Sequence, residues 1–203
     1  MKIRIKSKTK TIFIVYADSE IWGILPLKIL QIFSIYPGKE TIISKEQAKE
    51  LLLEIEKFAW DKLLNFLTYR ERSCGEEKSY LKQLPLKNSI YEKLVTKAIS
   101  ADFINDRRFT EFYIEDLIEK SKNEKEIKQK LFEKHIPEVM IKSMLLELFT
   151  PQKKEEVLIK NIEKALARFI RYKGRERKEK ILNYLSRKGF SYGEVKEKLE
   201  EYK

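Results

Sequence analysis

The feature that most constrains the fold of this chain is a pattern of apolar residues that recurs three times. In the last third of the chain the pattern consists of Ile181, Leu185, Phe190, Val195 and Leu199. Similar spacings occur upstream, where Ile127 precedes Ile181 by 54 residues and Leu81 precedes Leu131 by 50. A repeat of this length is typical of one supersecondary unit that is used several times. The sequence therefore predicts three copies of one small unit.

The composition favours helices for these copies. The chain has 203 residues but only 6 Gly and 5 Pro, so turns are few, and 42% of its residues are hydrophobic, so a core can be buried. Capping boxes, in which a Ser and a Glu or Gln three residues later bind each other's backbone amides, begin at Ser44, Ser73, Ser121 and Ser191. We expect a mainly α fold of three tandem three-helix, helix-turn-helix-like repeats in an extended row.

The first residues follow a different pattern. Ile3 and Ile5 alternate with basic residues, and the next apolar run is β-branched and aromatic, as in strands. With a turn at Asp18-Ser19, these residues predict a small β-hairpin, which a short helix and then a longer helix follow. The predicted domains are an α+β extension (1–56), repeat 1 (57–104), repeat 2 (105–152) and repeat 3 (153–203).

The charge of the chain points to a polyanionic partner. The formal net charge is +11, and seven cations lie between residues 168 and 180, interleaved with Phe169 and Tyr172. At the start of a helix such cations oppose the dipole unless an anion is near. The candidate nucleic-acid or filament-binding residues here are Arg168, Arg171, Lys173, Arg175, Arg177 and Lys178, and we expect Arg177 among others to face water. The alternative is a solvated charged face with Phe169 in the core.

Six further cations are candidates for the same surface. Arginine favours bidentate contacts with phosphate or carboxylate groups. At the junctions between predicted helices these candidates are Arg70, Arg72, Arg107, Arg108, Arg187 and Lys188. For the first four, the alternative is internal ion pairing to Glu71, Asp102 or Asp106. For the last two, it is simple complementation of a helix C-terminus.

The sequence offers little for catalysis or metal binding. Cys74 is the only cysteine and His135 the only histidine, so we expect no disulfide and no metal site. We find no nucleotide-binding loop and no catalytic triad, so we expect neither enzyme activity nor a cofactor. The apolar run near the amino terminus is too short for a membrane span, and a reducing, cytoplasmic compartment fits the cysteine usage.

Three stretches of the chain carry a resemblance to a known family. They are residues 69–76 (YRERSCGE), residues 104–109 (INDRRF) with Tyr113, and residues 184–190 (YLSRKGF). In order and spacing they resemble the RecX family of recombinase modulators. Two positions depart from the family pattern: Glu77 stands where an apolar residue is expected, and His135-Ile136 stands where Gly-Phe is common.

The resemblance implies a function. Members of the family bind the RecA recombinase and its filament on single-stranded DNA, and they inhibit its ATPase and strand exchange. We therefore expect a monomeric, non-enzymatic regulator of homologous recombination, DNA repair and the SOS response, with no membrane contact. The alternatives are an autonomous protein that binds single-stranded or duplex DNA through its repeats, and a helical scaffold whose charge serves solubility only.

Overall fold

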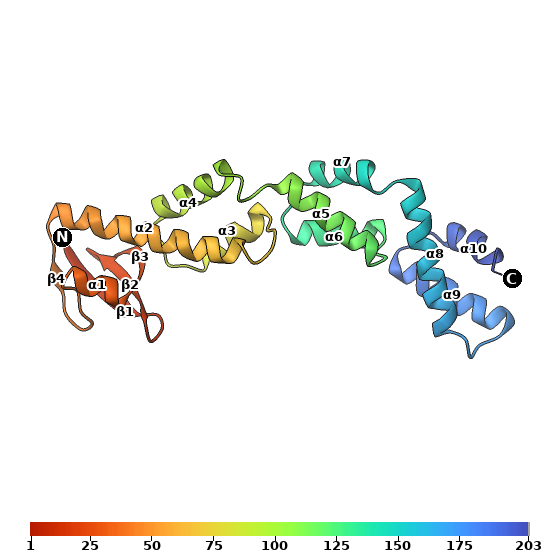
Figure 1. Ribbon diagram of the computed structural model, residues 1–203. Coiled ribbons are helices and arrows are strands. Elements are labelled where there is room, and N and C mark those ends of the chain that lie inside the picture. Colours follow the sequence, from red (N-terminus) through yellow and green to blue (C-terminus); the bar gives the residue numbers. More distant parts are fainter. Residues whose placement is uncertain (203) are drawn as a thin grey trace. The chain divides into compact units, whose positions relative to one another are not determined.

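The computed structural model describes residues 1–202, which form two compact units. The first unit comprises Met1–Asn105 and the second begins at Asp106. Figure 1 shows their strands and helices, and each unit is described by itself below. Among residues 1–202, no helix combines the length and the apolar character that crossing a membrane requires.

The first unit opens with a small antiparallel sheet. Its strands are β1 (Lys2–Ser7), β2 (Ile12–Ala17), β3 (Glu20–Pro26) and β4 (Thr41–Ile42), in the order β3-β2-β1-β4. The predicted turn at Asp18-Ser19 joins β2 to β3, and both residues have positive φ, 44° and 78°. Such turns match the twist of antiparallel strands. The hairpin is thus confirmed, as part of a larger sheet.

Helices cover one face of this sheet. Helix α1 (Leu27–Ile32) and helix α2 (Lys45–Leu67) share a core with the inward residues of the strands, such as Ile3 and Val15. The capping box at Ser44 is present as predicted. Gly23 allows α2 to lie close to β3, because a Cβ at this position would collide with Ile55.

Helix α2 continues without a break through residue 56, where the sequence places the end of the extension. Its buried residues follow each other at helical spacing along the whole length: Ala48, Leu51, Ile55, Ala59, Leu63 and Leu67. Because this stripe is uninterrupted, one helix serves both the sheet and the first three-helix group.

Three helical triplets follow each other along the chain. The first is α2 with α3 (Cys74–Lys82) and α4 (Asn88–Ser100). The second is α5 (Asp106–Glu119), α6 (Glu124–Glu133) and α7 (Glu138–Leu148). The third is α8 (Pro151–Arg168), α9 (Gly174–Lys188) and α10 (Tyr192–Glu200). Within each triplet all three helices contact one another.

The recurring apolar residues form the cores of these triplets. Leu81, Ile127, Leu131 and Leu185 are fully buried, and the mainly α fold of three-helix units is confirmed. Glu77 is also fully buried in α3, at the position where the family pattern has an apolar residue. The extended row of repeats, which concerns how the units are placed, stays a prediction.

The capping boxes were predicted with mixed success. Ser73 caps α3 with Glu76, as expected. The predicted box at Ser121 is wrong, because Ser121 has a left-handed φ of 57°, and Asn123 caps α6 instead, with Glu126. Ser191 stands at the start of α10 but its side chain makes no capping hydrogen bond.

Candidate nucleic-acid interface

The cation-rich segment predicted in the third triplet surrounds the connection between α8 and α9. We call its six candidate residues the third-triplet basic cluster: Arg168, Arg171, Lys173, Arg175, Arg177 and Lys178. Arg168 ends α8, Lys173 is the N-cap residue of α9, and the last three lie at the start of α9. The lysine side chain makes no capping hydrogen bond, so the amides at this helix start are left without a side-chain acceptor.

Four of the six cluster residues are exposed, and three of them lie in the connection or at the start of α9. Arg171, Lys173 and Arg175, which we call the exposed trio, are all exposed, and Arg175 is 92% exposed. Among residues 1–202, Arg171 and Lys173 make no ion pair, whereas Arg175 binds Glu179 one turn later at 2.9 Å. An exposed pair of this kind is weak, about 0–1 kcal/mol, so an incoming anion can replace it. Three cations beside the positive end of a helix dipole favour an anionic ligand.

The other three residues of the cluster make contacts within the third triplet, although Arg168 is itself exposed. Arg177 is half-buried and donates through Nη2 to the carbonyl of Leu166 at 2.8 Å, so the expectation that it faces water is wrong. Lys178 pairs with Glu200 at 3.0 Å. The guanidinium of Arg168 lies over the Tyr184 ring at 5.0 Å. These contacts tie the start of α9 to α8 and α10, and they reduce the number of cations that a ligand can reach.

Aromatic residues in this region also divide between core and surface. Phe169 packs against the core of the third triplet, with its ring edge-on to Tyr184 at 5.7 Å, as the alternative interpretation proposed. Tyr172 is 36% exposed, and Lys180 lies 4.3 Å from the centre of its ring. Ile170 is 69% exposed between them. The connection therefore presents one tyrosine and one isoleucine beside the exposed trio.

The arginines of the first triplet are held by internal contacts. Arg70 binds both carboxylate oxygens of Glu76, at 2.7 and 3.2 Å. Arg72 lies 4.2 Å from the Phe66 ring centre and 3.9 Å from a Glu76 oxygen. Burial, and then the charge of Arg70, lower the pKa of the Arg72 guanidinium. Internal pairing was the alternative for these residues, and Glu76, which faces this turn as part of the capping box, is an acid that both arginines approach.

The remaining candidates differ in exposure. Arg107 forms an exposed pair with Glu147 at 3.1 Å, and Arg108 is half-buried. Arg187 is exposed near the end of α9. Lys188 is half-buried, and its ammonium donates to the side chain of Asn161 at 2.9 Å. Arg107 and Arg187 thus remain accessible to a ligand, whereas Lys188 serves the interior.

A buried polar network that the sequence analysis missed joins the second and third triplets. Asn161 is 1% exposed and donates to the carbonyls of Ser121 at 2.9 Å and Val157 at 2.8 Å. The Asn123 side chain donates to the carbonyl of Lys188 at 2.5 Å. The signal in the sequence was an asparagine within the apolar stripe of α8, where an unpartnered amide would be costly.

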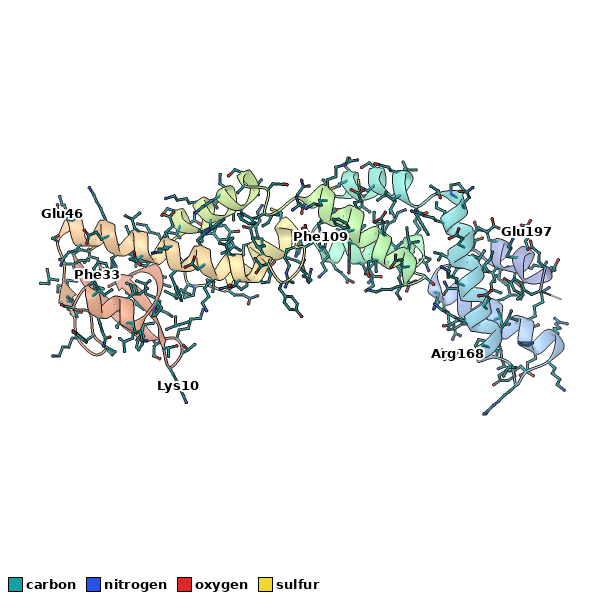
Figure 2. The ribbon with its side chains drawn as sticks, in the orientation of Figure 1. Lys10, Phe33, Glu46, Phe109, Arg168 and Glu197 are labelled. Atoms are coloured by element: carbon teal, nitrogen blue, oxygen red, sulfur yellow. The ribbon has the colours of Figure 1, made fainter. Side chains whose placement is uncertain are left out.

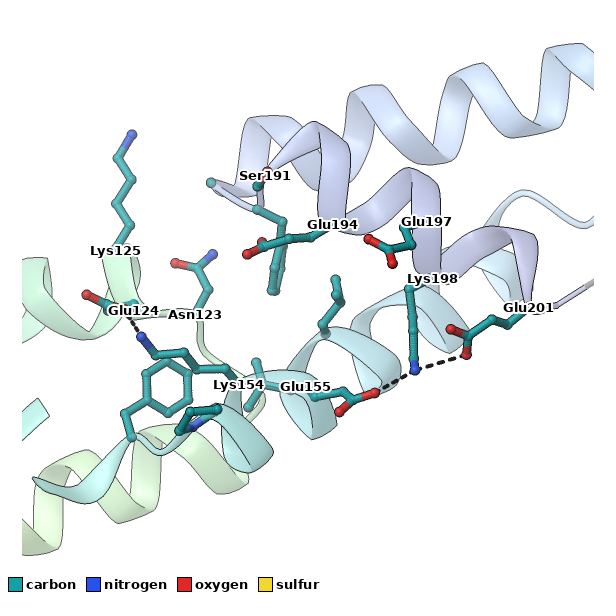
Figure 3. A pocket seen from close by; sticks show the side chains of 16 residues that line it. Asn123, Glu124, Lys125, Lys154, Glu155, Ser191, Glu194, Glu197, Lys198 and Glu201 are labelled. Carbon is teal, nitrogen blue, oxygen red and sulfur yellow. Dashed lines mark hydrogen bonds and ion pairs between the residues drawn. The ribbon is translucent and has the colours of Figure 1, made fainter. Parts of the chain in front are cut away.

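The same junction contains a cavity of about 710 Å³. Figure 3 shows its charged side chains, several of which bind one another across the cavity. Lys154 binds Glu124 at 2.7 Å, and Lys198 binds Glu155 at 2.5 Å and Glu201 at 2.9 Å. The hydrogen bond that the Lys198 ammonium donates to Glu155 is the main cause that raises the pKa of Lys198. Phe190, which belongs to the recurring apolar pattern, packs against the cores of both triplets. Lys154 and Phe190 thus connect the two triplets, whereas Lys198 ties α10 to α8 within the third triplet.

No arrangement typical of catalysis is seen in these surfaces. Within the described part of the chain, no group of three or more His, Cys, Asp or Glu side chains is placed to hold a metal ion. What the structure presents is a set of helical triplets with exposed cations at their connections. The fold defines a modular, mainly helical protein with a small amino-terminal sheet and exposed cations at its helix connections.

Comparison with known proteins narrows this class. The family model "RecX, third three-helix domain" matches residues 154–199, which lie within the third triplet. The regulatory protein RecX of Finegoldia magna is 30% identical over 208 residues, which cover 97% of this chain and 96% of that protein. The chain belongs to the RecX family. The regulatory protein RecX of Streptococcus uberis is 27% identical, over 97% of this chain and 75% of its own length.

Solved structures agree with this assignment. A crystal structure of regulatory protein RecX, 25% identical, superposes with a TM-score of 0.65 and covers 97% of this chain and 98% of its own. The structure of RecX from Lactobacillus salivarius, 27% identical, gives a TM-score of 0.63 over 72% of this chain and 95% of its own. The resemblance drawn from the sequence is confirmed, and the chain is a member of a family of regulatory proteins.

Proposed function

We propose that this protein is a monomeric, cytoplasmic regulator that binds the RecA filament on single-stranded DNA and inhibits its ATPase and strand exchange. The observation that carries the proposal is the exposed trio at the uncapped start of α9, in a chain of the RecX family. A helical filament offers phosphates and acidic protein faces to such cations. The protein has no catalytic part in this proposal and needs no cofactor.

We extend the proposal to the parts of the chain that bind the filament. Three repeats (57–104, 105–152 and 153–203) would bind the filament in succession, with residues 1–56 as an extension that shares α2 with repeat 1. Besides the exposed trio, Arg107 and Arg187 are exposed near helix ends. Cations at several places along the chain suit an elongated ligand that contacts more than one triplet. Affinity is then spread over several modest contacts.

The test is the rate of ATP hydrolysis by RecA on single-stranded DNA. The protein is expected to slow hydrolysis, and a variant with the exposed trio changed to Gln is expected to inhibit less at equal concentration. A matched control changes three exposed lysines of α2, Lys45, Lys49 and Lys57, to Gln and removes the same charge. Unchanged hydrolysis and strand exchange at saturating protein would refute the proposal.

The second candidate is an autonomous DNA-binding protein. The observation that favours it is the juxtaposition of the exposed trio with a half-exposed Tyr172, because cations with an aromatic side chain suit DNA without any recombinase. Salt-dependent binding of single-stranded or duplex DNA in the absence of RecA, together with unaffected RecA activity, would support this candidate over the first.

A further inference from the structure

The outer face of the amino-terminal sheet carries a row of cations that the helical triplets do not use. Along β1, Ile3 and Ile5 belong to or pack on the core, so Lys2, Arg4 and Lys6 lie on the opposite face of the sheet, and all three are exposed. The turn between β1 and β2 continues the row with Lys8 and Lys10. Figure 2 shows Lys10 pointing away from the sheet at the tip of this turn.

The strands beside β1 add apolar and aromatic surface to the same face. In the register of the sheet, Arg4 is opposite Tyr16 and Lys6 is opposite Ile14, both half-buried. Tyr16 and Ile14 do not contribute to the core shared with α2, because they lie on the other face. The face therefore combines a basic row with an adjoining row that contains one tyrosine ring.

Internal contacts neutralise only one end of the basic row. Glu40 pairs with Lys2 at 3.8 Å and with Arg4 at 3.4 Å, and all three side chains are at least half exposed. Lys8 donates to the carbonyl of Gln83 at 3.3 Å. Among residues 1–202, Lys6 and Lys10 make no ion pair, so the positive charge increases toward the tip of the turn.

We propose that this face binds single-stranded nucleic acid directly, with the basic row on the phosphates and Tyr16 stacked on a base. Cations at alternate positions of a strand suit a linear polyanion, and counterion release then drives binding. Tyr16 is half-buried and leaves part of its ring for an unpaired base to stack on, whereas the bases of a duplex are already stacked. The inference lies outside the repeats and needs no recombinase.

The experiment uses the full chain and a labelled 20-nucleotide single strand, followed by fluorescence anisotropy at several salt concentrations. Changing Lys6 and Lys10 to Gln is expected to weaken binding and to reduce the slope of log affinity against log salt by about 1.4, at about 0.7 for each phosphate contact. The matched control changes Lys49 and Lys57, which are exposed on α2, to Gln. It is expected to reduce the slope by less.

Tyr16 tests the stacking separately. Tyr16→Val keeps a strand-forming residue but removes the ring, and it is expected to weaken binding of the single strand about fivefold or more. Tyr16→Phe keeps the ring and is expected to bind as the unchanged protein does. Urea unfolding of each variant verifies that the sheet is intact.

Three outcomes would overturn the inference. One is an equal salt slope for the Lys6/Lys10 and Lys49/Lys57 variants. Another is unchanged binding with Tyr16→Val together with equally tight binding of a 20-base-pair duplex, which would remove the stacking contact and the preference for a single strand. The last is unchanged DNA binding with weaker inhibition of RecA, which would assign it to an acidic protein face. Because DNA binding is measured without RecA, failure here leaves the proposed function standing.

Discussion

Asn161 is expected to be a main determinant of the contact between the second and third triplets. Its side chain is buried in α8, where it donates to the carbonyls of Ser121 and Val157 and accepts from the ammonium of Lys188. Asn161→Ala removes all three hydrogen bonds. The Val157 carbonyl is still an acceptor in the helix ladder, but the Ser121 carbonyl lies at a buried helix end and loses a partner.

The expected loss of stability is about 2–4 kcal/mol. A buried carbonyl without a donor costs about 1–3 kcal/mol, and a hydrogen bond from a charged group contributes about 1.5–3 kcal/mol. The second value is reduced here because Lys188 is only half-buried and its ammonium can turn to water. Asn183→Ala is the control, since Asn183 is exposed on α9.

Hydrogen exchange and urea unfolding measure the effect. Exchange is expected to speed up in α6, α8 and α9 and to stay unchanged in residues 1–105, which form the other unit and serve as an internal reference. Urea unfolding followed by circular dichroism gives the size of the loss. If Asn161→Ala remains within about 0.5 kcal/mol of the Asn183→Ala control, the network does not hold the triplets together.

Three further predictions follow from the contacts described. Changing the exposed trio to Gln should change the free energy of unfolding by no more than about 0.5 kcal/mol per substitution. The same change should reduce the slope of log DNA affinity against log salt by up to about 2. Arg177→Ala should instead cost about 1–3 kcal/mol in urea unfolding, because the Leu166 carbonyl loses its donor. Ser73→Ala should cost about 0.5–2 kcal/mol by loss of a cap, whereas Ser191→Ala should cost much less; equal losses would contradict the difference in capping. Hydrogen bonds donated by Lys128, and then by Lys154, lower the pKa of Glu124 below its ordinary 4.5. The stability that ionised Glu124 contributes is therefore present above pH 4.5 and is lost as the pH falls through the lowered pKa. Glu124→Gln should reduce this loss in unfolding measured from pH 7 to pH 3.

The helical cores could be predicted from the sequence because buried residues of a helix recur at regular spacing as apolar residues. The apolar frame named Leu81, Ile127 and Leu185 as core residues, and all three are fully buried. The domain boundary that the sequence places at residue 56 falls inside α2, because neither a proline nor a glycine interrupts the apolar stripe of that helix. A repeat can be recognised even where its first helix begins inside the preceding module.

The capping boxes at Ser44 and Ser73 were predicted correctly, whereas the one at Ser121 was not. Residues 121–126 contain two overlapping boxes, one beginning at Ser121 and one at Asn123. The choice depends on where α5 ends: it ends at Glu119, and the left-handed φ of Ser121 then turns the chain, so that Asn123 is the residue that precedes α6. Because chain reversal is a matter of tertiary packing, composition and spacing alone could not decide between them.

The candidate site shows the same limit for charges. The sequence identifies every cation, but it does not show which are used internally. Arg70 binds an acid that also completes a cap, and Arg177 turns back to a carbonyl 11 residues earlier in the chain. Such contacts require the folded path of the chain, so twelve candidates could be named but not ranked.

The continuity of α2 has a consequence for how two ligand contacts on the first unit would cooperate. Its 23 residues form a rod of about 34 Å that is shared by the sheet and the first triplet. A flexible linker would let the two contacts search for their targets independently, at the cost of a low effective concentration. A shared helix fixes their separation instead, so a ligand whose spacing matches gains avidity, and one whose spacing differs can engage only one contact at a time.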